Sequence, residues 1–161
     1  MILRDRDILD MVRKGELRID NFVEKNLTPN GYDLTIEEIY IFSSRDTVRD
    51  GIAKIPPKTG FAVSTREFVG FPPTIAATLW IRTTWARKGI IASFGMIDAG
   101  FQGNLTLAAY NASDGPVAID LGNRFAQMVF QTLTAGAEKT YARRSGNYQG
   151  QRGVTLEKKT H

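Results

Sequence analysis

The chain has 161 residues, of which 42% are hydrophobic and 10% aromatic, so it can bury the core of one domain and is short for two. It contains no cysteine, which excludes a disulfide framework, a cysteine nucleophile and a cysteine zinc site, and its one histidine is His161. The net charge of +4 suits an anionic partner, a polyphosphate or a nucleic acid, without choosing between them. We expect a single domain over residues 1–161 and no histidine-based catalysis.

The first residues show no long apolar run of the kind found in signal peptides and membrane spans. We therefore expect a cytoplasmic protein that does not bind a membrane. A short helix is predicted from Asp5 to about Lys14, with Asp5 as its N-cap. Apolar residues recur there at helical spacing, and Gly15 follows as a stop.

From Leu34 onward, short runs rich in Val, Ile, Phe and Thr are separated by Gly, Pro and Asn, which is typical of a β-sandwich or barrel. The predicted strands are 33–42, 60–66, 74–84, 91–97, 104–111, 116–120 and 124–133. The tail from Ala135 to His161 is dominated by Gly, Ser, Asn, Gln, Lys and Arg. Because few apolar residues could anchor it, we expect this tail to be mobile.

Two segments before residue 90 combine a turn with charged side chains. Asp33 follows a turn glycine at the start of a strand, where it could project toward an ion or simply be a solvated turn residue. Residues 82–89, RTTWARKG, place cations and hydroxyls directly after an apolar strand. If the chain forms a helical turn there, these groups would bind an anion such as a triphosphate, and the alternative is a basic surface turn.

Two later segments could complete such a site. Asp98 ends an apolar strand inside a glycine-rich turn, where its carboxylate could hold a water for attack or merely support a hairpin. The ring of Phe101 could then pack against a sugar. The segment GNRFAQ at 122–127 and the basic, aromatic tail at 143–152 are the fourth candidate. Such a tail can be disordered, or it can close on an anionic ligand as a flap.

Taken in order, these segments resemble the dUTPase and dCTP deaminase superfamily, especially its short archaeal-type dUTPases. The matching blocks are NGYDL at 30–34, RTTWARKG at 82–89, GMIDAGFQGNLTLAAYN at 95–111, GNRFAQMVF at 122–130 and GNYQGQ at 146–151. The match covers nearly the whole chain. It implies a mostly β subunit of the distorted jelly-roll or β-clip (dUTPase-like) type with a short N-terminal helix. It also implies a homotrimer with active sites at subunit interfaces, over which a mobile tail, about residues 135–161, closes.

The resemblance implies roles for individual residues. The expected catalytic residues are Asp98 and Arg87. Asp98 matches the catalytic aspartate that binds the 3′-hydroxyl and orients or deprotonates the water, and Arg87 matches the arginine of the deaminase branch. Phe101 would exclude a ribose 2′-hydroxyl. The remaining substrate-binding positions are Arg82, Thr83, Thr84 and Gln127 at the phosphates and Tyr141, Tyr148 and Gln149 in the tail. The expected cofactor is Mg²⁺, chelated by the three phosphates, and Asp33 is expected to contact this hydrated ion through water.

The chain departs from the family pattern at several positions. Threonine replaces serine at 83 and 84, and Ile81 stands where dUTPases often have glycine. The resemblance implies that dCTP deaminases have a glutamate at the position of Ala108. That glutamate moves protons while water attacks C4 of cytosine, and the methyl group of alanine cannot move a proton. The sequence therefore predicts a dUTP pyrophosphatase that hydrolyses dUTP to dUMP and pyrophosphate, by water attack at the α-phosphorus, with no nucleic-acid partner.

Two alternatives stay open. One is a dCTP deaminase, or a bifunctional deaminase and dUTPase, including a form inactivated at Ala108, because a glutamate-to-alanine change would give this same sequence. The other is a non-catalytic nucleotide-binding protein or a basic nucleic-acid-binding module. The intact turn at Asp98 and the phosphate-binding segment argue against a purely binding role.

Overall fold

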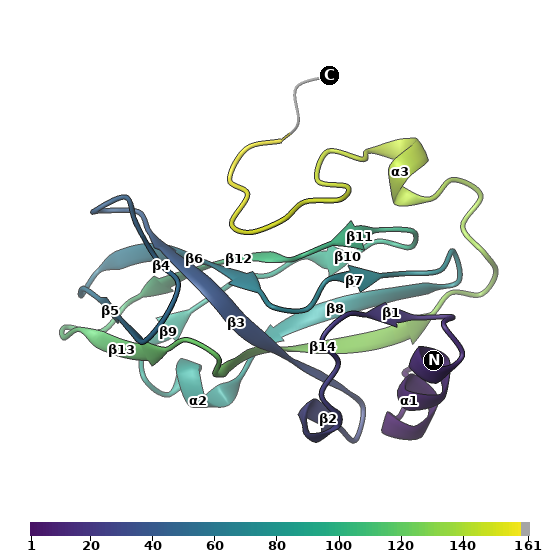
Figure 1. Cartoon of the computed structure of the whole chain (residues 1–161), viewed down its shortest axis with the longest axis horizontal. Coiled ribbons are helices and arrows are strands. Elements are labelled where there is room, and N and C mark those ends of the chain that lie inside the picture. Colours follow the sequence, from purple (N-terminus) through teal and green to yellow (C-terminus); the bar gives the residue numbers. More distant parts are fainter. Residues whose placement is uncertain (159–161) are drawn as a thin grey trace.

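The computed structural model describes residues 1–158, so His161 and the last residues of the predicted tail lie outside the described part of the chain. Figure 1 shows a curled antiparallel sheet with a short helix at one end and the C-terminal tail running along one edge. The mostly β architecture expected from the sequence is confirmed. Within residues 1–158, no helix is long and apolar enough to span a membrane.

The elements are short apart from a few long strands. The helices are α1 (Asp5–Arg13), η1 (Glu24–Asn26), α2 (Thr83–Ala86) and α3 (Tyr141–Arg144), and the strands are β1 (Arg18–Ile19), β2 (Leu27–Thr28), β3 (Gly31–Ile41), β4 (Asp46–Val48), β5 (Ile52–Ile55), β6 (Thr59–Thr65), β7 (Val69–Gly70), β8 (Ile75–Ile81), β9 (Ile90–Ile91), β10 (Met96–Ile97), β11 (Gln102–Gly103), β12 (Thr106–Asn111), β13 (Val117–Asp120) and β14 (Arg124–Thr132).

The largest sheet has the order β10-β8-β14-β3-β6-β12-β9, with β2 and β4 added to β3. Two smaller sheets have the orders β1-β7-β11 and β13-β5. The long strand β3 pairs with β14 near its start and with β6 farther along, and the register shifts in both ladders. Such irregularities bend a strand, and here they accompany the curl of the sheet around the core. The largest fully buried side chains of that core are Tyr32, Phe61, Phe125 and Phe130.

The N-terminal helix is confirmed, and its cap is not. Arg4 occupies the N-cap position with extended backbone and makes no capping hydrogen bond through its side chain. The prediction of Asp5 as the N-cap is therefore wrong, because Asp5 lies in the first helical turn. Gly15, with φ of +73°, ends the helical segment as expected, because glycine tolerates this left-handed conformation.

The long predicted strands are confirmed, with two corrections. The strand predicted over 91–97 is wrong: Ile91 pairs with Tyr110 of β12, whereas Met96 pairs with Thr78 of β8, and the chain changes partner between β9 and β10. The strand predicted over 74–84 ends at Ile81, because α2 follows. That helical turn is the conformation expected for a phosphate-binding segment.

Candidate functional site

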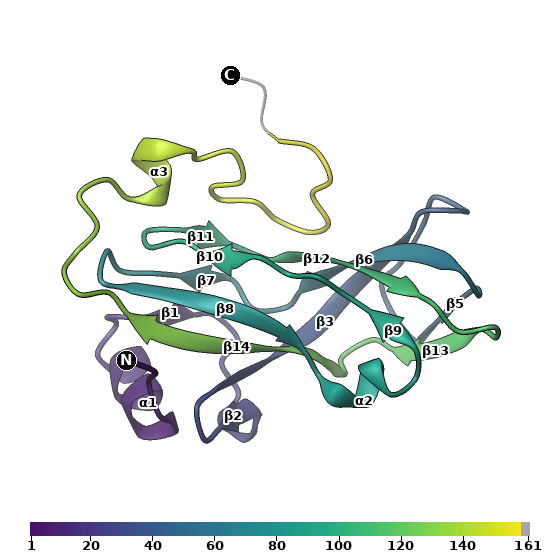
Figure 2. The same ribbon diagram turned by 180° about the vertical axis from the view of Figure 1, so that it is seen from behind.

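A pocket of about 380 Å³ opens where the hairpin after β10 meets β12 and the C-terminal tail. Figure 2 shows β10, β11 and β12 beneath the tail that follows α3. Asp98 stands in the turn after β10, and the N–H of Phe101 donates to its carbonyl oxygen at 3.1 Å. Among the residues that line this pocket, Asp98 carries the one carboxylate. The turn predicted to hold a catalytic aspartate therefore does face a cavity.

Two aromatic residues form part of the pocket lining. The Phe101 ring is 6% exposed and packs edge-on against Tyr141 of α3, with ring centroids 5.4 Å apart. The Tyr141 hydroxyl oxygen in turn accepts a hydrogen bond from the Tyr148 N–H at 3.0 Å. Phe101, Tyr141 and Tyr148 all line the pocket, so the structure brings these predicted substrate residues together.

The tail adds to the edge of β11 through its backbone. The N–H of Gly150 donates to the carbonyl of Gln102 at 2.6 Å, and the N–H of Asn104 donates to the carbonyl of Gln151 at 3.0 Å. The amide of Gln149 accepts from the N–H of Gln102 at 3.1 Å and donates to the carbonyl of Gly100 at 3.2 Å. Gln149 therefore contacts the hairpin that carries Asp98. Mobility of this tail in solution stays a prediction.

Asn104 is a structural residue of the site that the sequence analysis missed. Its buried side-chain amide donates to the carbonyls of Thr65 at 2.9 Å and Glu67 at 3.1 Å, which ties the hairpin to the end of β6. The Glu67 carboxylate is fully buried and accepts from the Thr35 N–H at 2.9 Å. Burial raises the pKa of Glu67, and the hydrogen bonds that the carboxylate accepts oppose this rise. Asn104 stands in the matching block 95–111 without a predicted role, and Glu67 stands in no block. Neither was expected to be buried, because Asn and Glu are more often found in solvent.

A second cluster surrounds Asp33. Its carboxylate Oδ2 lies 2.9 Å from Arg82 Nε and 3.2 Å from Arg124 Nη1, and its side chain is 5% exposed. Burial raises the pKa of Asp33, while the charges of the two arginines act in the opposite direction. Arg124 was not predicted as a site residue, although it stands in the fourth matching block. Its contact with Asp33 joins residues far apart in the sequence, which spacing alone cannot show.

The other predicted phosphate residues lie around this cluster. Thr83 and Thr84 are exposed on α2, and Arg87, which was predicted as a catalytic residue, is exposed directly after it. Gln127 pairs in register with Asp33 and donates through Nε2 to Thr28 Oγ1 at 2.7 Å. The segments 30–34, 82–89 and 122–130 thus meet in one region that carries exposed hydroxyls and cations.

Within one chain, the Asp98 pocket lies far from the cluster around Asp33. Ile97 pairs with Ala77 near the start of β8, so Asp98 lies beside Ala76, whereas Arg82 follows the other end of the strand. At the strand rise of about 3.3 Å per residue, the distance from Ala76 to Arg82 is about 20 Å. The structure therefore does not bring Asp98 and Arg87 together within one subunit.

The residues present do not fit a directly bound Mg²⁺ ion. Mg²⁺ requires near-octahedral coordination by oxygen atoms. Within the described residues, no group of three or more His, Cys, Asp or Glu could hold a metal ion. The Asp33 carboxylate already pairs with Arg82 and Arg124. Contact between Asp33 and the ion through water stays a prediction.

Ala108 lies on the pocket wall. It is an exposed residue of β12, pairs in register with Ala62 of β6 and lines the pocket that contains Asp98. Its side chain therefore points into the pocket and away from the core. The position at which the resemblance places a proton-carrying glutamate holds only a methyl group.

The family model and the sequence relatives agree on the family, and the solved structures show the fold. A family model described as dCTP deaminase-like matches residues 2–133. A protein of Thermococcus gammatolerans named dCTP deaminase is 39% identical over 146 residues, which are 89% of this chain and 91% of that protein. The 2′-deoxycytidine 5′-triphosphate deaminase of Agrobacterium tumefaciens aligns with a TM-score of 0.71 at 18% identity, over 82% of this chain and about half (48%) of that chain. The EIAV dUTPase aligns with a TM-score of 0.54 at 16% identity, over 76% of this chain and 93% of that one.

The structural matches show the dUTPase-like fold, as predicted. The prediction of a dUTP pyrophosphatase, and of dUTP as its substrate, is wrong. The family model is dCTP deaminase-like, and the T. gammatolerans relative, which matches along nearly all of the chain, is named dCTP deaminase. The predicted closer resemblance to archaeal-type dUTPases is also wrong, because the relative and the family model are of the dCTP deaminase type. Ala108 is one position, and it does not outweigh the identity along the rest of the chain.

Proposed function

Because this chain belongs to the dCTP deaminase-like family, we propose that it binds dCTP and releases the 4-amino group of cytosine as ammonia, leaving dUTP. The observation that carries this proposal is the carboxylate of Asp98 in a pocket closed by Phe101, Tyr141 and the tail. A polar group inside a largely apolar cavity is the usual arrangement of a small-molecule site. The full-length similarity to proteins named dCTP deaminases supports this substrate.

The reaction needs a group that moves protons. Water adds to C4 of cytosine, its proton passes to a base, and a proton then passes to the amine, so that ammonia leaves and a carbonyl remains. In this chain Asp98 is the one carboxylate of the pocket lining and is our candidate for that group. The Phe101 ring would pack against the deoxyribose, and the tail would exclude bulk water.

A neighbouring copy would complete the site. The α-phosphate is attached to the deoxyribose, which would lie beside Phe101 and Asp98. Arg82, however, lies about 20 Å from Asp98 along the same chain. We therefore propose a homotrimer in which the Arg82 cluster of one subunit faces the Asp98 pocket of the next. Mg²⁺ would enter with the triphosphate and neutralise part of its charge. Arg82, Thr83 and Thr84 would bind the phosphate oxygens.

Ala108 favours a second candidate, a pyrimidine deoxynucleotide-binding protein in which deamination is very slow. The pocket has the residues to enclose a nucleotide, but the wall at position 108 has no ionisable group. Loss of one acid–base group costs about 10²–10⁴-fold in rate. The two candidates thus share a ligand and differ in turnover.

The test measures ammonia and nucleotide products from dCTP with Mg²⁺, together with dCTP binding by calorimetry. The proposal expects ammonia and dUTP from the wild-type chain and no ammonia from Asp98→Asn. Asp114→Asn is the matched control, because Asp114 is an exposed residue paired with Lys58 at 2.9 Å and is absent from the pocket. Binding without ammonia would support the second candidate. Hydrolysis of dUTP with no action on dCTP would overturn both.

A further inference from the structure

The C-terminal tail forms one wall of the pocket through Tyr148, Gln151 and Thr155. In Figure 1 this part of the chain crosses above the strands that carry the hairpin. The shape of the pocket therefore depends on where residues 148–155, called here the closing segment, are held. One contact inside the pocket, at Thr106, and one outside it, at Glu38, hold this segment.

Glu38 of β3 makes a charged contact with the closing segment. Its Oε1 accepts a hydrogen bond from the Val154 N–H at 2.6 Å, and its Oε2 lies 3.1 Å from Nε of Arg49. The Glu38 side chain is only 14% exposed and is absent from the pocket lining. Hydrogen bonds to an ionised acceptor are about twice as strong as neutral ones. This contact is therefore a strong anchor on the segment.

The residue before Val154 is suited to this close approach. Gly153 has φ of +62°, and a Cβ atom added there would lie 2.8 Å from Oε1 of Glu38. A side chain at this position would meet both backbone strain and the carboxylate. The glycine lets the segment pass directly over Glu38.

Thr106 of β12 holds the same stretch from the other side. Glu38 and Thr106 both pair in register with Ser64, so their side chains lie on one face of the sheet. Thr106 Oγ1 accepts from the N–H of Thr155 at 3.0 Å and donates to the carbonyl of Gly153 at 3.4 Å. Two side chains of this face thus hold three consecutive residues of the segment.

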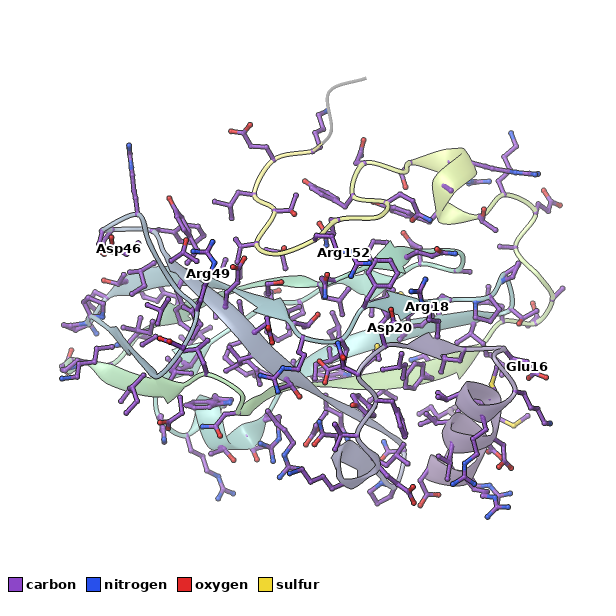
Figure 3. All side chains as sticks on the ribbon, in the orientation of Figure 1. Glu16, Arg18, Asp20, Asp46, Arg49 and Arg152 are labelled. Atoms are coloured by element: carbon purple, nitrogen blue, oxygen red, sulfur yellow. The ribbon has the colours of Figure 1, made fainter. Side chains whose placement is uncertain are left out.

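A cation–π contact adds an anchor upstream. The guanidinium of Arg152 lies 4.0 Å from the centroid of the Phe68 ring, and that of Arg18 lies 4.6 Å from the same centroid. Arg18 also binds Asp20 through two hydrogen bonds of 2.8 and 2.6 Å. Figure 3 shows Arg152 of the tail in the same region as Arg18 and Asp20.

We infer that Glu38 is a positioning residue, which holds the closing segment of the same chain over the nucleotide pocket without touching the nucleotide. The inference rests on the proposed function for the identity of the ligand. Its structural part, the anchoring of Val154, stands on the contacts alone. Glu38→Ala removes the acceptor, and Glu38→Gln keeps an oxygen but loses the charge.

The chain offers a matched control in the neighbouring residue Glu37. Its Oε2 pairs with Nε of Arg66 at 2.7 Å, so Glu37→Ala removes a comparable ion pair. No described hydrogen bond or ion pair joins Glu37 to the closing segment. Thermal melting of each variant shows whether it has folded.

The first measurement needs no substrate: limited trypsin digestion after Arg152 and hydrogen exchange at the Val154 amide, both without nucleotide. We expect about tenfold faster cleavage and exchange in Glu38→Ala, an intermediate effect in Glu38→Gln and none in Glu37→Ala. Equal behaviour of Glu38→Ala and the wild type would overturn the anchor, whether or not the chain deaminates dCTP.

The second measurement is steady-state kinetics with dCTP. Release of the closing segment in Glu38→Ala should raise KM about tenfold. It should change kcat less, because Glu38 does not reach the reacting atoms. An unchanged KM in a variant whose tail is released would overturn the positioning role. If the wild type has no turnover, dCTP affinity measured by calorimetry replaces KM, and the same comparison decides.

Discussion

Replacing Ala108 by glutamate should increase ammonia release from dCTP. Ala108 is exposed on β12 and points into the pocket that holds Asp98, so a longer side chain extends into the cavity of about 380 Å³ and not into the core. Its carboxylate would stand on the pocket wall where the resemblance places the proton-carrying group. The substitution adds a second ionisable carboxylate to a pocket lining in which Asp98 has the one carboxylate.

The expected size follows from general acid–base catalysis. Such a group contributes about 10²–10⁴-fold to the rate, or about 3–5 kcal/mol of activation free energy. The folded state should be little affected, because exposed substitutions usually change the unfolding free energy by about 0.5 kcal/mol or less. A large rate increase without a large change in Tm is therefore expected.

The assay is initial-rate ammonia release from saturating dCTP, with Ala108→Gln as the matched control. Glutamine has nearly the same size as glutamate, but its amide is neither a general acid nor a general base at neutral pH. The reasoning is refuted if Ala108→Glu is no faster than the wild type, or if Ala108→Gln is equally fast.

Three further predictions concern the core and the charged cluster. Phe130→Ala should lower the unfolding free energy by about 3–5 kcal/mol in chemical denaturation, because this fully buried ring stacks on Phe71; a loss below about 1 kcal/mol would contradict the packing. Burial raises the pKa of Glu67, so the stability that this group contributes is present at low pH and is lost as the pH rises above the ordinary glutamate value of about 4.3. Denaturation at several pH values should therefore show the wild type losing stability relative to Glu67→Gln as the pH rises, and a constant difference would contradict this. Asp33→Ala leaves Arg82 and Arg124 without their shared carboxylate and should lower Tm, whereas Asp50→Ala, an exposed control, should not.

The regular parts of the fold could be predicted because hydrophobic periodicity carries them. The helix over Asp5–Arg13 and the long strands β3, β6, β8 and β14 follow from such patterns. The two-residue strands β1, β7 and β11 could not be predicted, since too few residues exist to show a period. The split between β9 and β10 was also hidden, because it arises when the chain leaves β12 for β8.

The candidate site was predictable where a motif fixes a local turn. Asp98, Phe101 and Tyr148 of the matched blocks line one pocket together with Tyr141, while their roles toward a nucleotide stay predictions. The predicted substrate is wrong because the single departure at Ala108 does not decide between two related activities. Contacts between distant segments, such as Glu38 with Val154, have no signature in the sequence at all.

The most direct test of the proposed activity follows the 4-amino nitrogen of dCTP itself. Wild-type protein is incubated with Mg²⁺ and dCTP labelled with ¹⁵N at that amine, and the label is followed by NMR. The proposal predicts that the label moves to ammonium while dUTP forms. Unchanged dCTP after prolonged incubation with a protein that binds it would contradict the proposed deaminase.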